Sequence, residues 1–460
     1  MINKATREKG RIQFACIDQF VPQDHLVRKL ENAIDFDFIY DEVKGLYCED
    51  NGRPGIDPVT LFKLVFVQRM FGIRSMRQTI KEIQVNMAYR WFCNLDMFDE
   101  VPHFTTFGKN YERRFKDTNI FQSIFDRILN ECIRHGFIDT ENIFIDSTHI
   151  KASANKRKKI EEYIVAERKN YQDALDREID EERAANGKKP LKRESKQELK
   201  KITKSKVDPG AGDFHKGEHE RCFAYSAHTA CDKKGFVLKT TVTPANIHDS
   251  RAFSEVYQDV ISKHEVKNVA LDAGYKTPAI AKEIIDSGKK PIMPYTCPKG
   301  QGKLKEGQYK KSQYIYNSAR DYYVSPEAEV FTYRTTDRNG YRQYRTPGNP
   351  RILTRHIWQD YIDTVNILRL TPDGKEIYRQ RKETIERVFG DAKEKHAMRW
   401  TTLRGLSNIQ QQATMTFACM NLKKMANRLA KTKPYGGKPS PISAFFTKLL
   451  SFFKIRPKYI

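Results

Sequence analysis

The sequence predicts an α/β protein in which a mixed sheet, with helices against it, follows an all-helical domain. Over residues 1–137 apolar side chains recur at spacings of three and four, which is typical of helices. From residue 138 the pattern changes to short runs rich in β-branched and aromatic residues, which indicate strands. Helical segments then alternate with the later strands, as expected for helices packed on a sheet.

The first domain should contain several short helices. They are expected in LVRKLENAIDFDFIYDEV, PVTLFKLVFVQRMFG, SMRQTIKEIQVNMAYRWF and HFTTFGKNYERRF. In the second, Asp57 is the expected N-cap and Pro58 the first helical residue. The last carries Lys109, Arg113 and Arg114 on its later face. Short helices ending in a basic one suit a helix-turn-helix-like DNA reader, although a helical bundle used for dimerisation fits the same pattern.

Five strands and two helices are expected in the sheet domain. The strands are NIFIDSTHIKA, FAYSAHTACD, GFVLKTTVTP, NVALDAGY and KPIMPY. The helix RAFSEVYQDVISKH lies between the third and fourth strands. The helix TPAIAKEIIDSG lies between the fourth and fifth, opened by Thr277-Pro278 and closed by Gly288.

A charged insertion interrupts this sheet at residues 156–206. It holds 17 Lys or Arg and 11 Asp or Glu residues. A thin stripe of apolar residues at helical spacing runs through it: Ile160, Ile164, Leu175 and Ile179. We therefore expect a solvated helical hairpin or coiled-coil arm, broken near Asn186-Gly187.

A second, β-rich insertion is expected at residues 299–370. It contains EVFTYRTTDRNGYRQYRT, a hairpin turned at Asn339-Gly340. Its outward face should be crowded with arginine and tyrosine, which can clamp phosphates and stack on bases, or simply protect the sheet edge. Helices follow at 371–430, and a basic, amphipathic tail at 431–460 is too short to span a bilayer, so docking on the body or on a partner is expected.

The formal net charge of +24 favours a polyanionic partner, because phosphate neutralisation supplies most non-specific affinity for nucleic acid. The eight cysteines are scattered with no CxxC pair, which indicates reduced thiols rather than disulfides. No apolar run is long enough for a membrane span, and the start of the chain lacks a secretory pattern, so a cytoplasmic location is expected.

Two aspartates follow apolar strand residues at points where the chain is expected to reverse. Asp146 should end the first strand and Asp272 the fourth. If these strands are neighbours, the carboxylates meet at the carboxyl edge of the sheet, with Glu386 as a third ligand from a helix. Oxygen ligands of this kind suit Mg²⁺ or Mn²⁺, and two ions would serve phosphoryl transfer. The alternative is that the aspartates are turn residues and that Glu386 pairs with Lys382.

Four motifs in order, FIDSTHIKA, TPANIHDS, LDAGY and ERVFGDAKEKHAMRWTTLRGL, resemble those of the DDE transposases of bacterial insertion sequences. GRPGIDPVTLFKLVFVQRMFGIRSMRQTI and HFTTFGKNYERRF resemble the InsH-type N-terminal domain. The resemblance implies a DNA-end-binding domain at 1–137 and a ribonuclease H-like core at 138–155 and 207–298, completed by the helices of 371–430. It also implies that Asp146, Asp272 and Glu386 bind divalent metal and are catalytic.

Related transposases carry a Tyr-Arg-Glu-Lys pattern around the catalytic glutamate, and the match here is partial. Lys393 follows Glu386 by seven residues, so that both can face one phosphate. Arg381 is five residues before Glu386, whereas Lys382 has the family spacing of four. The residues that the resemblance places at DNA in this region, unless they are ordinary surface charges, are Tyr378, Arg381, Lys382, Lys393, Arg399 and Arg404.

Relatives often have a cysteine cluster in the β-rich insertion, whereas DYYVSPEAEVF and YRTPGNPRILTRHIW have none, so no structural zinc is expected. The spacing His215-x3-His219-x2-Cys222 is a weak metal pattern. His248 either helps to position the site or lies beside a helix cap formed by Asp249 and Ser250.

The resemblance implies a transposase that binds terminal inverted repeats, hydrolyses a phosphodiester and joins the freed 3′-hydroxyl to target DNA. Its partners would be double-stranded DNA and a second copy of the chain in a synaptic complex, with no membrane, in the cytoplasm and at the nucleoid. Two alternatives remain open from sequence. One is a transposase-derived DNA-binding protein that has lost catalysis, and the other is a metal-dependent nuclease without strand transfer.

Overall fold

The computed structural model describes residues 15–48, 55–165, 171–193, 199–216, 220–295 and 309–432. The chain forms two compact units. The first, called the helical unit here, comprises residues 1–137, 391–398 and 411–460, and the second, the sheet unit, comprises 138–390 and 399–410. Residues 433–460 of the predicted tail lie outside the described residues. His219 of the weak metal pattern lies outside them as well.

None of the described helices is both long enough and apolar enough to cross a membrane. The helices of the first unit are α1 (Ile17–Phe20), α2 (Leu26–Glu31), α3 (Phe38–Val43), η1 (Lys44–Leu46), α4 (Pro58–Met70), α5 (Met76–Val85), α6 (Met87–Phe92), α7 (Thr105–Asn110), η2 (Tyr111–Phe115) and α8 (Ile120–Arg134). The end of α13 (Pro372–Lys395) and most of α14 (Leu406–Thr432) join them. The prediction of a helical first part of the chain is confirmed.

Helix α4 forms the centre of the helical unit because nearly all of its residues are buried. Its start is as predicted, with Pro58 in the first turn and Asp57 accepting from the backbone nitrogens of Val59 and Thr60 at 3.3 and 3.0 Å. Lys63 lies inside this core and is 1% exposed, and its ammonium is neutralised by Glu31 at 2.8 Å. A buried charge is tolerated here because it is paired.

His396, which follows α13, should make the stability of the helical unit pH-dependent. It is 3% exposed, and Nδ1 donates to the carbonyl of Arg69 at 2.8 Å. Burial lowers the pKa of His396 to about 4 from the ordinary 6.5. Because the unfolded chain then takes up the proton more readily, the stabilisation is complete above pH 6.5 and is lost as the pH falls toward 4.

We expect this loss to reach about 3 kcal/mol, since one pKa unit corresponds to about 1.4 kcal/mol. Thermal unfolding of wild type and His396→Gln, measured from pH 7.5 to 4.5, should show a stability difference that shrinks with acidification. The glutamine amide can donate the same hydrogen bond but does not titrate. Parallel curves for the two proteins would contradict the assignment.

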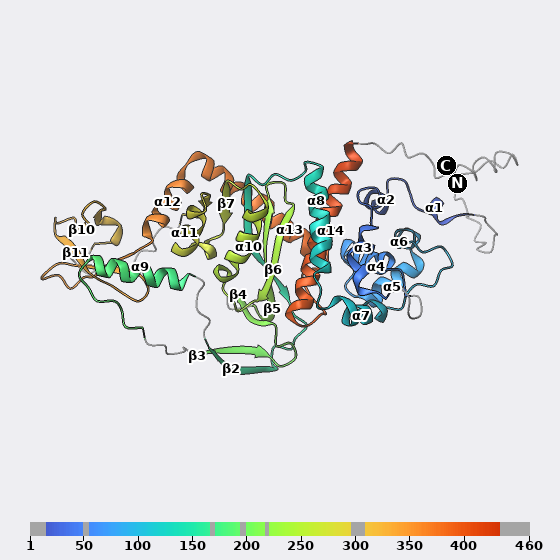
Figure 1. The fold of residues 1–460 in the computed structure, drawn as a ribbon, viewed down its shortest axis with the longest axis horizontal. Coiled ribbons are helices and arrows are strands. Elements are labelled where there is room, and N and C mark those ends of the chain that lie inside the picture. Colours follow the sequence, from blue (N-terminus) through green and yellow to red (C-terminus); the bar gives the residue numbers. More distant parts are fainter. Residues whose placement is uncertain are drawn as a thin grey trace, which may run out of the picture. The chain divides into compact units, whose positions relative to one another are not determined.

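The main sheet of the second unit has the strand order β2-β3-β4-β5-β1-β7-β8, and β6 also pairs with β5. Its strands are β1 (Asn142–Lys151), β2 (Lys159–Val165), β3 (Leu199–Ser205), β4 (Gly212–Lys216), β5 (Glu220–Asp232), β6 (Val237–Pro244), β7 (Asn268–Leu271) and β8 (Lys290–Ile292). β1 is antiparallel to β5 and parallel to β7, which is parallel to β8. The predicted mixed sheet is confirmed, and so are the five strands predicted for it, which are β1 and β5 to β8. Figure 1 labels β5, β6 and β7 among them.

The two predicted helices of this region are also present, as α10 (Asp249–Lys263) and α11 (Pro278–Asp286), with the short η3 (Ala273–Tyr275) between β7 and α11. α10 contacts β5 and β6, whereas α11 contacts β8. Thr277 caps α11 by accepting from the nitrogen of Ile280 at 3.3 Å, and Pro278 follows in the first turn, as the sequence predicts.

The pairing of β1 with β7 fixes the place of the predicted acidic pair. Ile145 lies opposite Leu271, so Asp146 and Asp272 come next on neighbouring parallel strands. The expectation that the first strand ends at Asp146 was wrong, because β1 continues to Lys151 while pairing with β5. The pairing of β1 with β7 does end at Ile145 and Leu271, so Asp146 and Asp272 lie where these two strands separate.

The charged insertion is not a helical hairpin. Among the described residues of this insertion (156–165, 171–193 and 199–206) only α9 (Gln172–Ala185) is helical, while β2 and β3 pair as an antiparallel ribbon that β4 connects to the main sheet. Ile160 and Ile164 therefore belong to a strand, and Ile160 is 49% exposed. The predicted helix break is confirmed, since α9 ends before Asn186 and Gly187 has φ +67°.

The second insertion is a separate sheet of order β13-β12-β11-β10-β9. Its elements are η4 (Lys311–Gln313), β9 (Ile315–Asn317), β10 (Tyr322–Val324), β11 (Val330–Thr336), β12 (Tyr341–Arg345), β13 (Leu353–His356) and α12 (Gln359–Leu370). The predicted hairpin joins β11 to β12 and closes at Gly340, whose φ of +80° is the left-handed region that favours glycine.

The face of this hairpin differs in part from the prediction. Tyr344 is fully buried and Tyr333 packs against it, in an aromatic cluster with Tyr314, Tyr323 and Phe331. Arg334, Arg338 and Arg345 are exposed. Most of the tyrosines therefore build the core of the small sheet, and the outward face is mainly arginine, because the rings lose more exposed apolar area by turning inward.

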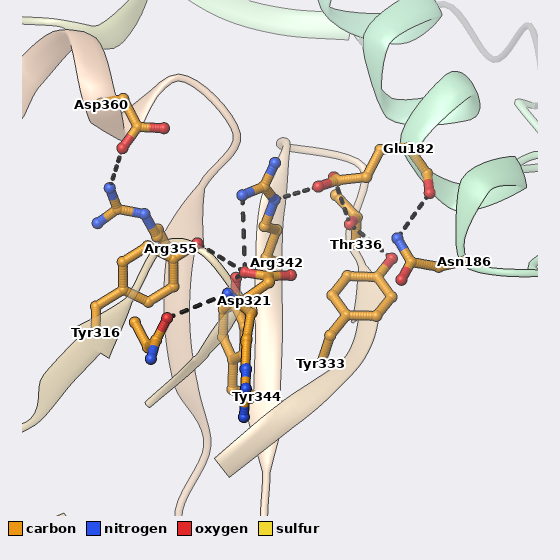
Figure 2. Close-up of polar contacts among 12 residues, drawn as sticks. Glu182, Asn186, Tyr316, Asp321, Tyr333, Thr336, Arg342, Tyr344, Arg355 and Asp360 are labelled. Atoms are coloured by element: carbon orange, nitrogen blue, oxygen red, sulfur yellow. Dashed lines mark hydrogen bonds and ion pairs between the residues drawn. The ribbon is translucent and has the colours of Figure 1, made fainter. Parts of the chain in front are cut away.

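Helix α9 packs on this second sheet, far away in sequence (Figure 1). Figure 2 shows Glu182 between Arg342 and Thr336, with the Thr336 hydroxyl donating to it at 2.9 Å. On the same face of α9, one and two turns before Glu182, Ile179 and Leu175 pack with Trp358. The arm helix and the β-rich insertion thus form one packed body.

Candidate active site

The site begins with two carboxylates that converge on one guanidinium. Arg381 of α13 donates to Asp146 Oδ2 at 2.6 Å and lies 3.8 Å from Asp272 Oδ1. Arg381 is 4% exposed, the Asp146 side chain 17% and the Asp272 side chain 50%. The strand register aligns the aspartates, and a helix from more than a hundred residues later supplies the cation between them.

Burial makes Asp146 hard to ionise. It raises the pKa of Asp146 to about 6, while Arg381 opposes the rise and the charges of Asp272 and Asp249 add to it. Ionisation of this buried carboxyl is therefore unfavourable even with a guanidinium in contact, and a bound cation would favour it. A carboxylate pair of this kind fits a divalent cation, whose oxygen ligands are mostly carboxylates.

A third carboxylate, that of Asp249, lies beside this pair, although the sequence predicts Asp249 as part of a helix cap. The cap of α10 is His248, whose Nδ1 accepts from the nitrogen of Ser250 at 3.3 Å. Asp249 instead hydrogen-bonds the side chain of Ser147, and burial raises the pKa of Asp249, with the charge of Asp272 adding to the rise. Asp249 is the first residue of α10, five residues after the end of β6, so it lacks the signal that marks Asp272, which directly follows β7.

A neutral, buried layer supports the three carboxylates. His228 of β5 is fully buried, and it lies 2.8 Å from the Thr243 hydroxyl through Nε2 and 3.4 Å from the Tyr275 hydroxyl through Nδ1. Burial lowers the pKa of His228 to about 4, so it is uncharged at neutral pH. Burial raises the pKa of Tyr275 well above its ordinary value, and the charge of Asp249 adds to this.

Tyr378 lies at the same place on α13. Its ring is 4.4 Å from the guanidinium carbon of Arg369 and 6.0 Å from that of Arg381. Burial raises the pKa of Tyr378, and the charge of Asp272 contributes. Of the predicted Tyr-Arg-Glu-Lys pattern, the structure therefore brings the tyrosine and Arg381 to the aspartates.

Glu386 is placed differently. It is exposed, on a side of α13 away from the buried stripe formed by Arg381, Ile385 and Val388. Five positions along a helix correspond to a rotation of about 140°, so Arg381 and Glu386 point in different directions. Among the described residues, no hydrogen bond or ion pair joins Glu386 to the aspartates, and no three side chains of His, Cys, Asp or Glu are grouped as a metal site.

The other predicted DNA-binding residues are mostly at the surface. Lys382, Arg399 and Arg404 are exposed. Lys393 is in the last turns of α13, in the part that belongs to the helical unit.

In the helical unit, Lys109 of α7 and Arg113 of η2 are exposed. Arg114 is half-buried, because it bonds Asn110 and its guanidinium carbon lies 4.5 Å from the ring centroid of Tyr47.

Two family descriptions match the chain. "Transposase domain (DUF772)" matches residues 15–113, and "Transposase DDE domain" matches residues 202–422. Asp272 and Glu386 fall inside the second match, whereas Asp146 lies between the two.

Among solved structures, the cryo-EM structure of a piggyBac transposase synaptic complex with hairpin DNA is similar, with a TM-score of 0.35 and 10% identity over 95% of this chain and 80% of that one. No curated protein matches the chain.

Proposed function

This chain belongs to the DDE transposases, and from that premise we propose that Asp146 and Asp272, with Glu386, form its catalytic centre. The proposed reaction excises an insertion sequence by phosphodiester hydrolysis at its terminal inverted repeats and joins the freed 3′-hydroxyl to target DNA. The observation that supports it best is the convergence of Asp146 and Asp272, adjacent in a parallel register, on Arg381.

DDE transposases use divalent metal ions. Mg²⁺ or Mn²⁺, as one or two ions held by Asp146, Asp272 and Glu386, would supply the charge that neutralises the phosphate. Asp249 adds a further carboxylate oxygen at the same place. Glu386 is on the exposed side of α13 in this structure. The proposal therefore requires that Glu386 moves toward Asp146 and Asp272 when DNA is bound. The proposal involves no structural zinc.

The chain's own residues would act by positioning and charge. Arg381 is held in a buried ion pair and can neutralise a phosphate oxygen without having to become ordered first. Tyr378 packs against it and keeps the guanidinium in place. Hydrolysis and strand transfer are both in-line displacements at phosphorus, so one centre serves both without a covalent protein intermediate.

The helical unit is the proposed reader of the DNA ends, through Lys109, Arg113 and Arg114. Tyr378, Lys382, Lys393, Arg399 and Arg404 would contact DNA near the cleaved bond. Two copies of the chain would hold two ends in a synaptic complex, in the cytoplasm and at the nucleoid. The net charge of +24 supports a DNA partner.

An excision assay tests the function. A marker flanked by the inverted repeats found beside the gene is offered to the protein in Mg²⁺ or Mn²⁺, and excision and joining are scored on gels. Excision with joining would establish the transposase. Cleavage without joining would support a nuclease, and specific end binding without cleavage would support an inactive DNA-binding protein.

We expect Asp249→Asn to lower the cleavage rate by roughly 10- to 100-fold while leaving DNA binding within twofold. Its carboxylate lies with the catalytic pair, and loss of one charged group at such a site typically has an effect of this size. Cleavage rates and binding by gel shift would be compared with Asp259→Asn, a matched control on the same helix whose carboxylate pairs with Lys263 at 3.0 Å. Equal rates for both variants would remove Asp249 from the site.

Arg113→Ala should weaken DNA binding equally for all sequences and flatten its salt dependence. An exposed arginine on a basic helix contacts phosphate, and one lost phosphate contact lowers the slope of log K against log salt by about 0.9. Binding would be measured from 50 to 300 mM salt. Arg134→Ala is the control, since that arginine is exposed but paired with Glu131 at 2.8 Å. An unchanged slope for Arg113→Ala would argue that α7 and η2 face away from DNA.

A further inference from the structure

Trp400 is an exposed aromatic residue held rigidly at the edge of the main sheet. The backbone of Lys151, the last residue of β1, donates to the carbonyl of Arg399 at 3.1 Å, and the nitrogen of Thr401 donates to the carbonyl of Lys151 at 3.0 Å. These bonds pair Trp400 with the end of β1. Despite this anchoring the Trp400 side chain is 55% exposed. The backbone of Trp400 is thus fixed while its ring stays accessible to solvent, and an accessible aromatic ring can stack on a base.

A cation already lies on this ring. The ammonium of Lys151 is 4.8 Å from the centroid of the Trp400 ring, a cation–π distance. A side chain can cover only one face of an indole, so the exposure that remains leaves aromatic surface for a second flat group. The arrangement presents stacking surface and positive charge together.

Trp400 borders a hollow of about 500 Å³ within the sheet unit. It is lined by Ala152, Ser153, Ala154, Asn155, Lys158, Val207, Trp400, Thr401 and Arg404. Lys158 and Arg404 are exposed, and no acidic residue is among those lining the hollow. The small residues 152–154 leave room beside the indole. An aromatic wall with cations around it and no carboxylate suits a nucleobase with its attached phosphates.

We propose that this hollow, the Trp400 pocket, receives an unpaired nucleotide of the DNA substrate, with its base on the indole and its phosphates at Lys158 and Arg404. The inference rests on the proposed function for its substrate. A paired base keeps its faces inside the duplex stack, so only an unpaired one can stack on Trp400. Along β1, Lys151 is about 16 Å from Asp146 at 3.3 Å per residue, which is about five base-pair steps. The nucleotide is thus close to the cleaved bond.

The test measures binding without catalysis. The full chain, in EDTA, is titrated into a short single-stranded DNA that carries the fluorescent base 2-aminopurine, and into the fully paired duplex of the same sequence. Trp400→Ala should weaken single-strand binding by roughly 5- to 150-fold, since one stacked base contributes about 1–3 kcal/mol. Trp400→Phe should retain most of the affinity and the quenching of the probe. Duplex binding should change by less than twofold.

Leu403→Ala is the matched control, because Leu403 is 38% exposed in the same segment but does not line the hollow. It should bind both DNAs as wild type does. Arg404→Gln should weaken single-strand binding several-fold and keep the quenching, which tests the pocket independently of the stability of the Trp400 variants. Melting curves of each variant check its fold.

Single-strand affinity that is unchanged in Trp400→Ala, or lost equally for single strand and duplex, would overturn the pocket. If wild type excises DNA in the assay above, the transposase proposal survives that result. Conversely, a selective Trp400 effect in a protein that never cleaves would support the pocket and count against the catalytic proposal.

Discussion

Replacing Asp272 with asparagine is expected to reduce cleavage at least about a thousandfold and to leave DNA binding nearly intact. Asp272 is half exposed, lies next to Asp146 in the strand register and has no part in the buried core, so the substitution removes charge without disturbing the fold. Loss of a charged group that neutralises the reacting phosphate costs several kcal/mol in the transition state, and about 4 kcal/mol is a factor of a thousand. Single-turnover cleavage and gel-shift binding would measure the two effects separately.

Asp286→Asn supplies the control for this variant. Asp286 is the last residue of α11 in the same unit, and it pairs with Lys282 on the surface at 2.8 Å. Asp146→Asn should match Asp272→Asn in cleavage, and Glu386→Gln tests whether the exposed glutamate of α13 joins them. Cleavage by Asp272→Asn at the wild-type rate would show that the site assignment is wrong.

Removal of Arg381 should lower activity and move its pH dependence upward. Burial raises the pKa of Asp146 to about 6, and Arg381 holds it from rising further. Arg381→Met removes the positive charge that lowers the pKa of Asp146, so Asp146 ionises only at higher pH. We expect the acidic limb of the cleavage profile to shift up by about one unit or more, because a neighbouring cation typically lowers a carboxyl pKa by 1–3 units.

Cleavage measured from pH 5.5 to 9 would show this shift, and Arg381→Lys should recover part of it by restoring the charge. Lys382→Met is the matched control, since Lys382 is the next residue and is exposed. The pair of variants also decides which residue acts as the basic partner. An effect in Lys382→Met that is absent in Arg381→Met would reverse the assignment and favour the residue with the family spacing.

The sequence predicted the parts of the fold that depend on short-range signals. Asp57 and Pro58 directly precede an apolar run at helical spacing and so mark the start of a helix, and alternating or continuous apolar runs identify β1 and β5 to β8. The acidic pair was predictable because both residues follow apolar runs whose parallel pairing is set by the burial of those strands.

What the sequence could not predict depends on long-range contacts. The Ile160 and Ile164 spacing fits a helix or a strand, and pairing with β3 decides for the strand. In the sequence, Asp249 cannot be distinguished from any other acidic residue at the start of a helix. Only its contacts in the fold, with Ser147 of β1 and with the charge of Asp272 after β7, bring it to the site. The rotation of α13, which buries Arg381 rather than Glu386, is set by packing on the sheet and not by spacing along the chain.

The contacts of α9 bear on how such a chain could be shortened or rearranged. Residues 156–206 and 299–370 are far apart in the sequence, yet Glu182 of one pairs with Arg342 of the other, and Ile179 packs with Trp358. Deleting residues 156–206 alone would leave the half-buried guanidinium of Arg342 without its carboxylate (Figure 2) and Trp358 without its apolar cover. Deleting residues 299–370 alone would leave Glu182 without its cation and expose Ile179. The two segments therefore stabilise each other, and a shortened form of the chain would have to lose both of them together.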